Sequence, residues 1–270
     1  FVNGVFENYQ TLDGSTLFLG AFFFTIQIYG DFSGYSDIAI GCARLFGIDL
    51  MQNFKYPYFS RDIAEFWRRW HISLTTWFRD YIYIPLGGSR AGKWKSFRNT
   101  LVIFLVSGFW HGANWTFVAW GAYHALLFLP FLLLGQNRRY RDSVAENSFL
   151  PSVKELTQMG VTFLLVLLGW ILFRSEDISQ AAVYLERMFN ASLFSAPQLV
   201  GLGFGQLLLK KCFFFTALMF IVEWIGRKQA HGLMIEDLSL PVRYVIYTVL
   251  LIIIYGFDAS NPQGFIYFQF

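Results

Sequence analysis

Six apolar segments constrain this chain more than any other feature. They lie at roughly residues 16–30, 99–110, 115–135, 158–174, 207–226 and 243–257. Only 14% of all residues are charged, whereas an average soluble domain carries about 25%. A chain with so little charge cannot cover a fold of this size with polar surface. We therefore predict an all-α, polytopic helical bundle in a membrane, rather than a soluble protein with a large core.

The segments follow one another without an internal repeat, so residues 1–270 are predicted to form one membrane-embedded unit. The chain starts at Phe1 rather than Met, and no basic or cleavable leader precedes the first apolar segment. We therefore expect the C-terminal part of a longer protein, with further spans before it. Residues 175–206 carry several acids and are the one stretch expected outside the membrane.

Some of these segments are too short to cross a bilayer. Residues 99–110 would extend only about 18 Å as a helix, and the sequence Trp110-His111-Gly112-Ala113-Asn114 then interrupts them. Broken or re-entrant helices around a central cavity are therefore expected, because irregular backbone at membrane depth must be satisfied by protein or water.

Two basic loops flank this interrupted region, at residues 87–98 and 138–154. The positive-inside tendency places both loops in the cytoplasm, so the chain between them enters the membrane and returns. The orientation of the C-terminal segments stays open, because Lys210 and Lys211 fall on the side that simple alternation makes external.

Residues 62–98 combine a predicted amphipathic helix with the first basic loop. Between Asp62 and Pro85, aromatic residues recur every three or four positions, and polar residues fall opposite them. A helix rich in Trp and Tyr is expected at headgroup depth, or dipping through the cytoplasmic interface.

The four histidines differ in what they can do. His111 sits in the interruption between apolar segments, where an ionisable residue is costly and is by default a functional candidate. The neutral imidazole favoured there can accept a proton; the alternative is that His111 only ties broken helix ends together. His71 lies on the aromatic stripe, where packing is the simpler explanation. His124 is most simply a helix–helix hydrogen bond, and His231 a loop residue.

Asp31 and Asp37 interrupt the first apolar region. Either they cap helix ends, or they belong to a polar network or the wall of a substrate cavity. The run from Gly87 to Trp94 resembles the start of a phosphate-binding loop but lacks its Ser or Thr. We find no metal-binding spacing and no nucleic-acid signature, and the two cysteines are expected to be packing residues.

Three stretches resemble the signature regions of the membrane-bound O-acyltransferase family, in its bacterial alginate O-acetyltransferase branch. They are Gln27 to Asp37, Asn53 to Gly88 with its Arg-Trp-His-Ile-Ser sequence, and Gly108 to Thr116 with its Trp-His-Gly sequence. The resemblance implies that His111 is catalytic and that His71 is a second active-site residue. Candidates for substrate or cavity contacts are Asn114, Asp31, Asp37, Trp110 and Arg79.

The resemblance also implies a reaction and a location. The donor would be cytoplasmic acetyl-CoA, with no tightly bound cofactor and no metal. The acceptor would be a polysaccharide exported across a bacterial inner membrane, reached through a periplasmic partner protein. Proximity to His111 in the sequence, rather than the resemblance, makes Asn114, or the amides of Gly112 and Ala113, candidates for stabilising the oxyanion. Arg90, Lys93 and Lys95 would meet the CoA phosphates, although an orientation signal explains them more simply.

Two other functions share these features. A transporter or acyl conduit also uses broken helices with polar residues at mid-depth, but the two halves of this chain lack matching interrupted segments. A scaffold of a polysaccharide acetylation complex would need no chemistry of its own. Substitution of His111 should abolish acetyl transfer by an acyltransferase but not the function of a transporter or a scaffold.

Overall fold

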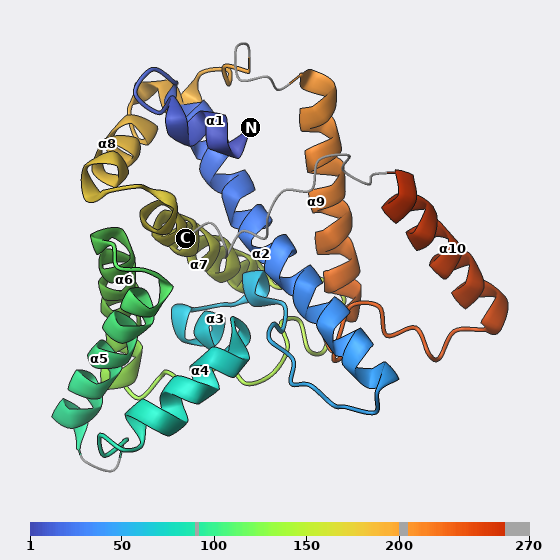
Figure 1. The fold of residues 1–270 in the computed structure, drawn as a ribbon, viewed down its shortest axis with the longest axis horizontal. Coiled ribbons are helices and arrows are strands. Elements are labelled where there is room, and N and C mark those ends of the chain that lie inside the picture. The colour runs from blue at the N-terminus through green and yellow to red at the C-terminus, as the bar shows by residue number, and fades with distance from the viewer. Residues whose placement is uncertain (90–91, 200–204, 257–270) are drawn as a thin grey trace.

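The computed structural model describes residues 1–89, 92–199 and 205–256, and every regular element in this part of the chain is helical (Figure 1). The elements are α1 (Val2–Glu7), α2 (Gly14–Leu45), η1 (Pro57–Phe59), α3 (Ile63–Arg69), α4 (Ile72–Phe78), η2 (Arg79–Tyr83, a π-helical turn), α5 (Lys93–His111), α6 (Trp115–Leu133), α7 (Val153–Arg174), α8 (Ile178–Met188), η3 (Ala191–Phe194), α9 (Gln206–Gly226) and α10 (Leu240–Gly256).

The predicted apolar segments become helices α2, α5, α6, α7, α9 and α10, which confirms the all-α prediction. By length and composition, α6 and α7 stand out among the described helices as able to cross a membrane. The predicted interruption after Trp110 is also confirmed, because α5 ends at His111 and α6 begins at Trp115.

Helix α2 corrects one expectation. It runs unbroken for 32 residues, so Asp31 and Asp37 lie inside it and neither caps a helix end. Both side chains are exposed. An aspartate costs a helix interior less than about 1 kcal/mol, and a long helix easily accommodates two of them when they reach polar surroundings.

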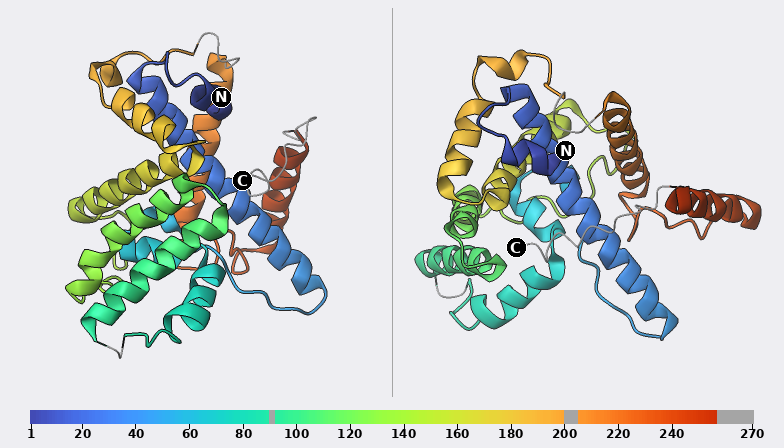
Figure 2. Two further views of the ribbon diagram at one scale, coloured as in Figure 1. Left: turned by 60° about the vertical axis from the view of Figure 1, so that its left-hand side comes forward. Right: turned by 45° about the horizontal axis from the view of Figure 1, so that its top comes forward.

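Helices α5 and α6 form an antiparallel hairpin and lie side by side in both views of Figure 2. Glycines allow their backbones to approach closely. A Cβ atom at Gly108 would collide with the carbonyl oxygen of Phe117, and one at Gly121 with that of Phe104. Small residues at such contacts are the usual device for packing helices inside membranes. The hairpin fixes His111 at its turn.

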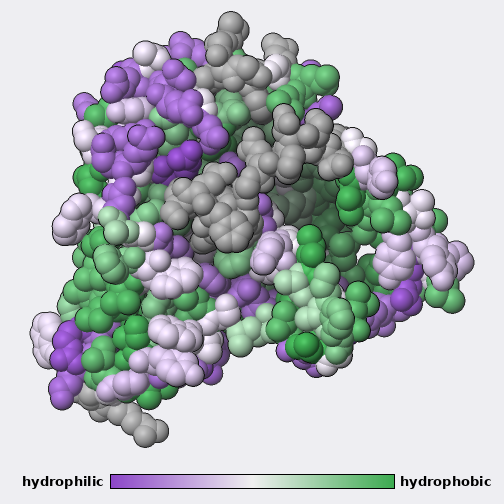
Figure 3. All heavy atoms as spheres, in the orientation of Figure 1, coloured by the Kyte–Doolittle hydropathy of each residue, from purple (hydrophilic) through white to green (hydrophobic). Residues whose placement is uncertain are grey.

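The core forms where α2, α3, α6 and α7 meet. Its largest fully buried side chains include Trp70 from the α3 end, Trp120 from α6 and Trp170 from α7. Helices α1 and α8 pack at one end of α2. In Figure 3 hydrophilic residues gather at the upper left, where Figure 1 shows α1 and α8, and hydrophobic residues dominate the lower left around α5 and α6.

Candidate active site

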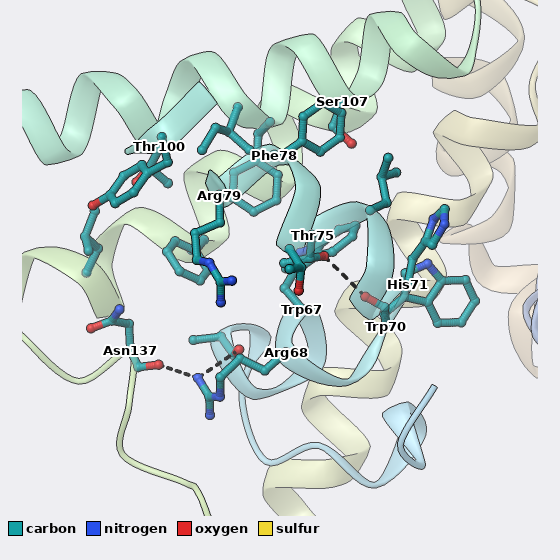
Figure 4. A pocket seen from close by; sticks show the side chains of 18 of the residues that line it. Trp67, Arg68, Trp70, His71, Thr75, Phe78, Arg79, Thr100, Ser107 and Asn137 are labelled. Atoms are coloured by element: carbon teal, nitrogen blue, oxygen red, sulfur yellow. Dashed lines mark hydrogen bonds between the residues drawn. The ribbon is translucent and has the colours of Figure 1, made fainter. Parts of the chain in front are cut away.

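A cavity of about 600 Å³ lies among α3, α4, α5 and α6. Most of its wall is apolar and aromatic. The ionisable and amide-bearing side chains that line it are Arg68, His71, Arg79, His111, Asn137 and Arg138. In Figure 4, Asn137 and Arg68 lie at one side of the cavity and His71 lies at the other. The cavity therefore joins a basic end to the two histidines.

His71 lies at a sharp bend that the sequence pattern did not predict. The expected single amphipathic helix is two short helices, α3 and α4, and His71 between them has φ of 44°. A left-handed conformation costs a non-glycine residue about 1–3 kcal/mol, and such strain is concentrated at functional sites. The bend turns the His71 ring into the cavity instead of along a helix face.

The loop before α3 forms hydrogen bonds with the backbone groups that have no helical partner at the bend. The Ile72 amide donates to the Asn53 carbonyl oxygen at 2.9 Å, and the Lys55 amide donates to the Arg69 carbonyl oxygen at 3.0 Å. The Ser73 hydroxyl donates to the Asn53 side-chain oxygen at 2.5 Å. These bonds replace the helical ones, as buried backbone requires.

Aromatic rings surround both imidazoles. His71 contacts Phe32 of α2, with ring centroids 4.7 Å apart. His111 contacts Trp120 at 5.3 Å and Phe173 at 5.0 Å, each nearly perpendicular to it. Burial lowers the pKa of His71, which lies outside the long apolar helices, to about 4. His71 is therefore neutral at physiological pH.

Trp110 connects the two histidines. Its ring centroid lies 5.0 Å from that of His111 and 6.3 Å from that of His71. The two imidazoles are close enough to interact electrostatically. Residues 40 positions apart in the sequence thus meet at one point, which gives the cavity two adjacent groups able to accept or donate a proton.

Helix α3 is held in place by a buried ion cluster. The carboxylate of Glu65 is 1% exposed and accepts from Arg61 at 3.0 Å and from Arg69 at 2.6 Å. Arg61 also pairs with Asp142 at 3.3 Å, which ties α3 to the segment before α7. Such a cluster is costly to break, because a lost partner leaves charge buried and uncompensated.

The basic end of the cavity also depends on this segment. Arg68 donates hydrogen bonds to the carbonyl oxygens of Asn137 and Tyr140. It therefore holds the chain on both sides of Arg138 beside the cavity. Sequence reasoning overlooked Arg68, Asn137 and Arg138, although two of them are basic residues in stretches that it had singled out.

The oxyanion candidates have other hydrogen-bond partners. The side chain of Asn114 caps α6 by accepting from the Thr116 amide at 3.1 Å, and it donates to the Glu176 carbonyl oxygen at 2.7 Å. The Gly112 amide donates to the Phe109 carbonyl oxygen at 3.2 Å. Asn114 is not among the residues that line the cavity, so its role as an oxyanion donor stays a prediction.

Other candidates lie away from the cavity. Asp31 and Asp37 are not among its lining residues, and neither are Lys93 and Lys95. Arg90 lies outside the described residues. Arg79, by contrast, lines the cavity and pairs with Asp80 at 2.7 Å.

His124 differs from its prediction. Within the described residues neither of its ring nitrogens has a hydrogen-bond partner, so it forms no helix–helix hydrogen bond. It is completely buried and packs edge-on against Trp67 at 4.9 Å and Trp120 at 5.3 Å. His124 therefore packs against Trp67 and Trp120, which line the cavity, without lining it itself.

Comparison with known proteins places this arrangement in a family. Residues 4–145, which contain both cavity histidines, match the model of the membrane-bound O-acyltransferase family. The chain belongs to the membrane-bound O-acyltransferase family. Membership confirms the resemblance seen in the sequence, and it identifies the helical bundle as that of a membrane protein.

Curated relatives in this family act on different polymers. The chain is 43% identical over 196 residues to a probable alginate O-acetylase of Pseudomonas aeruginosa, covering 71% of this chain and 36% of the relative. It is 37% identical to a peptidoglycan O-acetyltransferase of Helicobacter pylori, covering 70% of this chain and 34% of the relative. It is 30% identical to a teichoic acid D-alanyltransferase of Bacillus subtilis, covering 57% and 40%. The chain spans roughly a third of the length of these relatives.

Proposed function

We propose that this protein is an O-acyltransferase of a bacterial inner membrane, which transfers an acetyl group from acetyl-CoA to hydroxyl groups of an exported polysaccharide. The observation that carries the proposal is the cavity, because Arg68, Arg79 and Arg138 line it together with His71 and His111, and Arg68 and His71 lie on different sides of it (Figure 4). The names of the relatives, two O-acetylating proteins and one that transfers D-alanine, support transfer of a short acyl group.

The basic end suits an acyl donor that carries phosphates. Arg68, Arg79 and Arg138 line it, and guanidinium groups form strong, charge-assisted hydrogen bonds to phosphate. The basic loops around residues 87–98 and 138–154 support a cytoplasmic position for this end, by the positive-inside tendency. Acetyl-CoA is available there, and its thioester would reach the histidines through the apolar part of the cavity.

His111 acts as the general base. A hydroxyl group attacks the thioester carbonyl while its proton passes to the imidazole, and a new C–O bond forms. The tetrahedral intermediate then breaks its C–S bond, and the CoA thiolate takes the proton from the imidazolium. Proton transfer of this kind accelerates reactions by about 10² to 10⁴. His71, neutral and adjacent, orients the attacking hydroxyl or the base.

The acceptor polymer lies on the other face of the membrane. We expect it to be presented there with the help of a periplasmic partner protein.

The test is replacement of His111 by Ala in the full chain, expressed in membranes. Acetylation of the surface polysaccharide is measured by mass spectrometry, and protein abundance by immunoblot. We expect acetylation to fall by at least about 10². His231→Ala is the matched control, because His231 is not among the residues that line the cavity. Normal acetylation by an abundant His111→Ala protein would refute the proposal and favour a conduit or scaffold.

A further inference from the structure

Trp110 occupies an unusual position beside the candidate active site. Its ring touches both imidazoles, yet 55% of its surface is exposed. It is not among the residues that line the cavity. One side of the indole therefore lies next to the two histidine rings, and more than half of the surface of Trp110 is exposed.

This position is opposite the basic end of the cavity. Trp110 lies one residue before the end of α5, and the basic loop precedes the start of the same helix at Lys93. A helix of that length separates its ends by about 26 Å, which is close to the thickness of the hydrocarbon core. The basic loop and Trp110 therefore lie at opposite ends of α5.

The neighbouring exposed tryptophan offers a contrast. Trp115 begins α6 and is 77% exposed. Trp110 and Trp115 thus share the same hairpin turn, but contact with His71 and His111 distinguishes Trp110. Placement of tryptophan at a membrane interface explains an exposed ring. It does not explain a ring packed against two catalytic candidates.

We propose that Trp110 is the acceptor-side contact of the active site, where it binds the sugar ring that carries the attacking hydroxyl and keeps water away from the histidines. The proposal rests on the proposed acetyl transfer. An indole presents a flat apolar face with a hydrogen-bond donor at its edge. That combination fits a pyranose, which has an apolar C–H face and hydroxyl groups around its rim.

The proposal predicts how the reaction changes when the ring is removed. In acetyl transfer the sugar hydroxyl oxygen bonds to the acetyl carbon, the C–S bond breaks, and the proton ends on the CoA thiol. If water enters in place of the sugar, the same bonds break and the products are acetate and CoA. Loss of the indole should weaken sugar binding and raise this hydrolysis.

The experiment uses the full chain in membranes, with acetyl-CoA as donor and the host's own surface polysaccharide, deacetylated by mild alkali, as acceptor. Released CoA and polymer-bound acetyl are measured separately. For Trp110→Ala we expect the KM for the polysaccharide to rise about tenfold and the fraction of acetyl-CoA hydrolysed to rise several-fold. The KM for acetyl-CoA should stay within about twofold.

Two further variants complete the test. Trp110→Phe retains a flat ring and should recover most of the coupling between CoA release and transfer. Trp115→Ala is the matched control and should behave as the wild type. An unchanged polysaccharide KM and hydrolysed fraction in Trp110→Ala would overturn the proposal, and so would a change confined to acetyl-CoA. A wild-type protein that uses no acetyl-CoA would instead refute the proposed function.

Discussion

The imidazole of His124 lies against Gly169 so closely that a Cβ atom on that glycine would stand 2.5 Å from Nε2. His124 is on α6 and Gly169 on α7, so the contact sets the distance between these two helices. The same imidazole supports Trp67 and Trp120, which line the cavity. The distance between α6 and α7 therefore affects the position of His124, and through it the positions of Trp67 and Trp120 in the cavity wall.

Gly169→Ala should therefore destabilise the protein. The methyl group must displace His124 or separate α6 from α7, and such overpacking costs about 1–3 kcal/mol. The free energy of unfolding is measured on protein purified in detergent. Gly160→Ala is the control, because Gly160 lies on the same helix with open space around it. Equal stability of the two variants would show that the contact has no energetic consequence.

Glu65→Gln should unfold the region around α3. The change removes the negative charge between Arg61 and Arg69, so Arg69 loses its carboxylate partner, whereas Arg61 keeps its pairs with Asp142 and Glu155. Breaking a buried pair in this way costs about 3–5 kcal/mol. Thermal unfolding in detergent measures the loss. Asp80→Asn, which breaks the exposed pair with Arg79, should leave the stability nearly unchanged. A Glu65→Gln protein as stable as the wild type would contradict the role of the cluster.

The stability of the protein should depend on pH through His71. Burial lowers the pKa of His71 to about 4 from an ordinary value of 6.5. Between these values the unfolded chain binds a proton that the folded chain excludes, so stability falls as the pH drops from 6.5 toward 4. His71→Asn removes the titration, and Asn tolerates the left-handed backbone. The unfolding temperature should fall less between pH 7.5 and pH 5 in this variant than in the wild type; parallel curves would refute the assignment.

Arg138→Ala should weaken binding of acetyl-CoA. If Arg138 meets the phosphates of the donor, its loss raises the KM for acetyl-CoA several-fold and leaves kcat nearly unchanged. Acetyl-pantetheine, which lacks the nucleotide phosphates, should not distinguish the variant from the wild type. Lys93→Ala serves as the control, because Lys93 is a nearby cation that is not among the cavity-lining residues. An equal effect with both donors would exclude a phosphate contact.

The helical segments and the hairpin turn could be predicted from the sequence alone. Apolar runs specify helices through local composition, and the polar, glycine-containing interruption after Trp110 specifies the hairpin turn. The same interruption singled out His111. One of the two interpretations of Asp31 and Asp37 was wrong, because neither residue caps a helix end and the helix continues to Leu45. Local residue type is weak evidence when the rest of the helix is long and stable.

The sequence by itself determined the helical segments, the turn that holds His111, and the family to which the motifs point. Only the tertiary structure decided that His71 bends out of an amphipathic stripe to meet His111, and that Arg138 comes from a distant loop to the same cavity. The reason is physical. Helices and turns follow from neighbours in the chain. At the bend, by contrast, the Ile72 amide donates to the Asn53 carbonyl oxygen and the Lys55 amide donates to that of Arg69, and no periodic pattern encodes these hydrogen bonds.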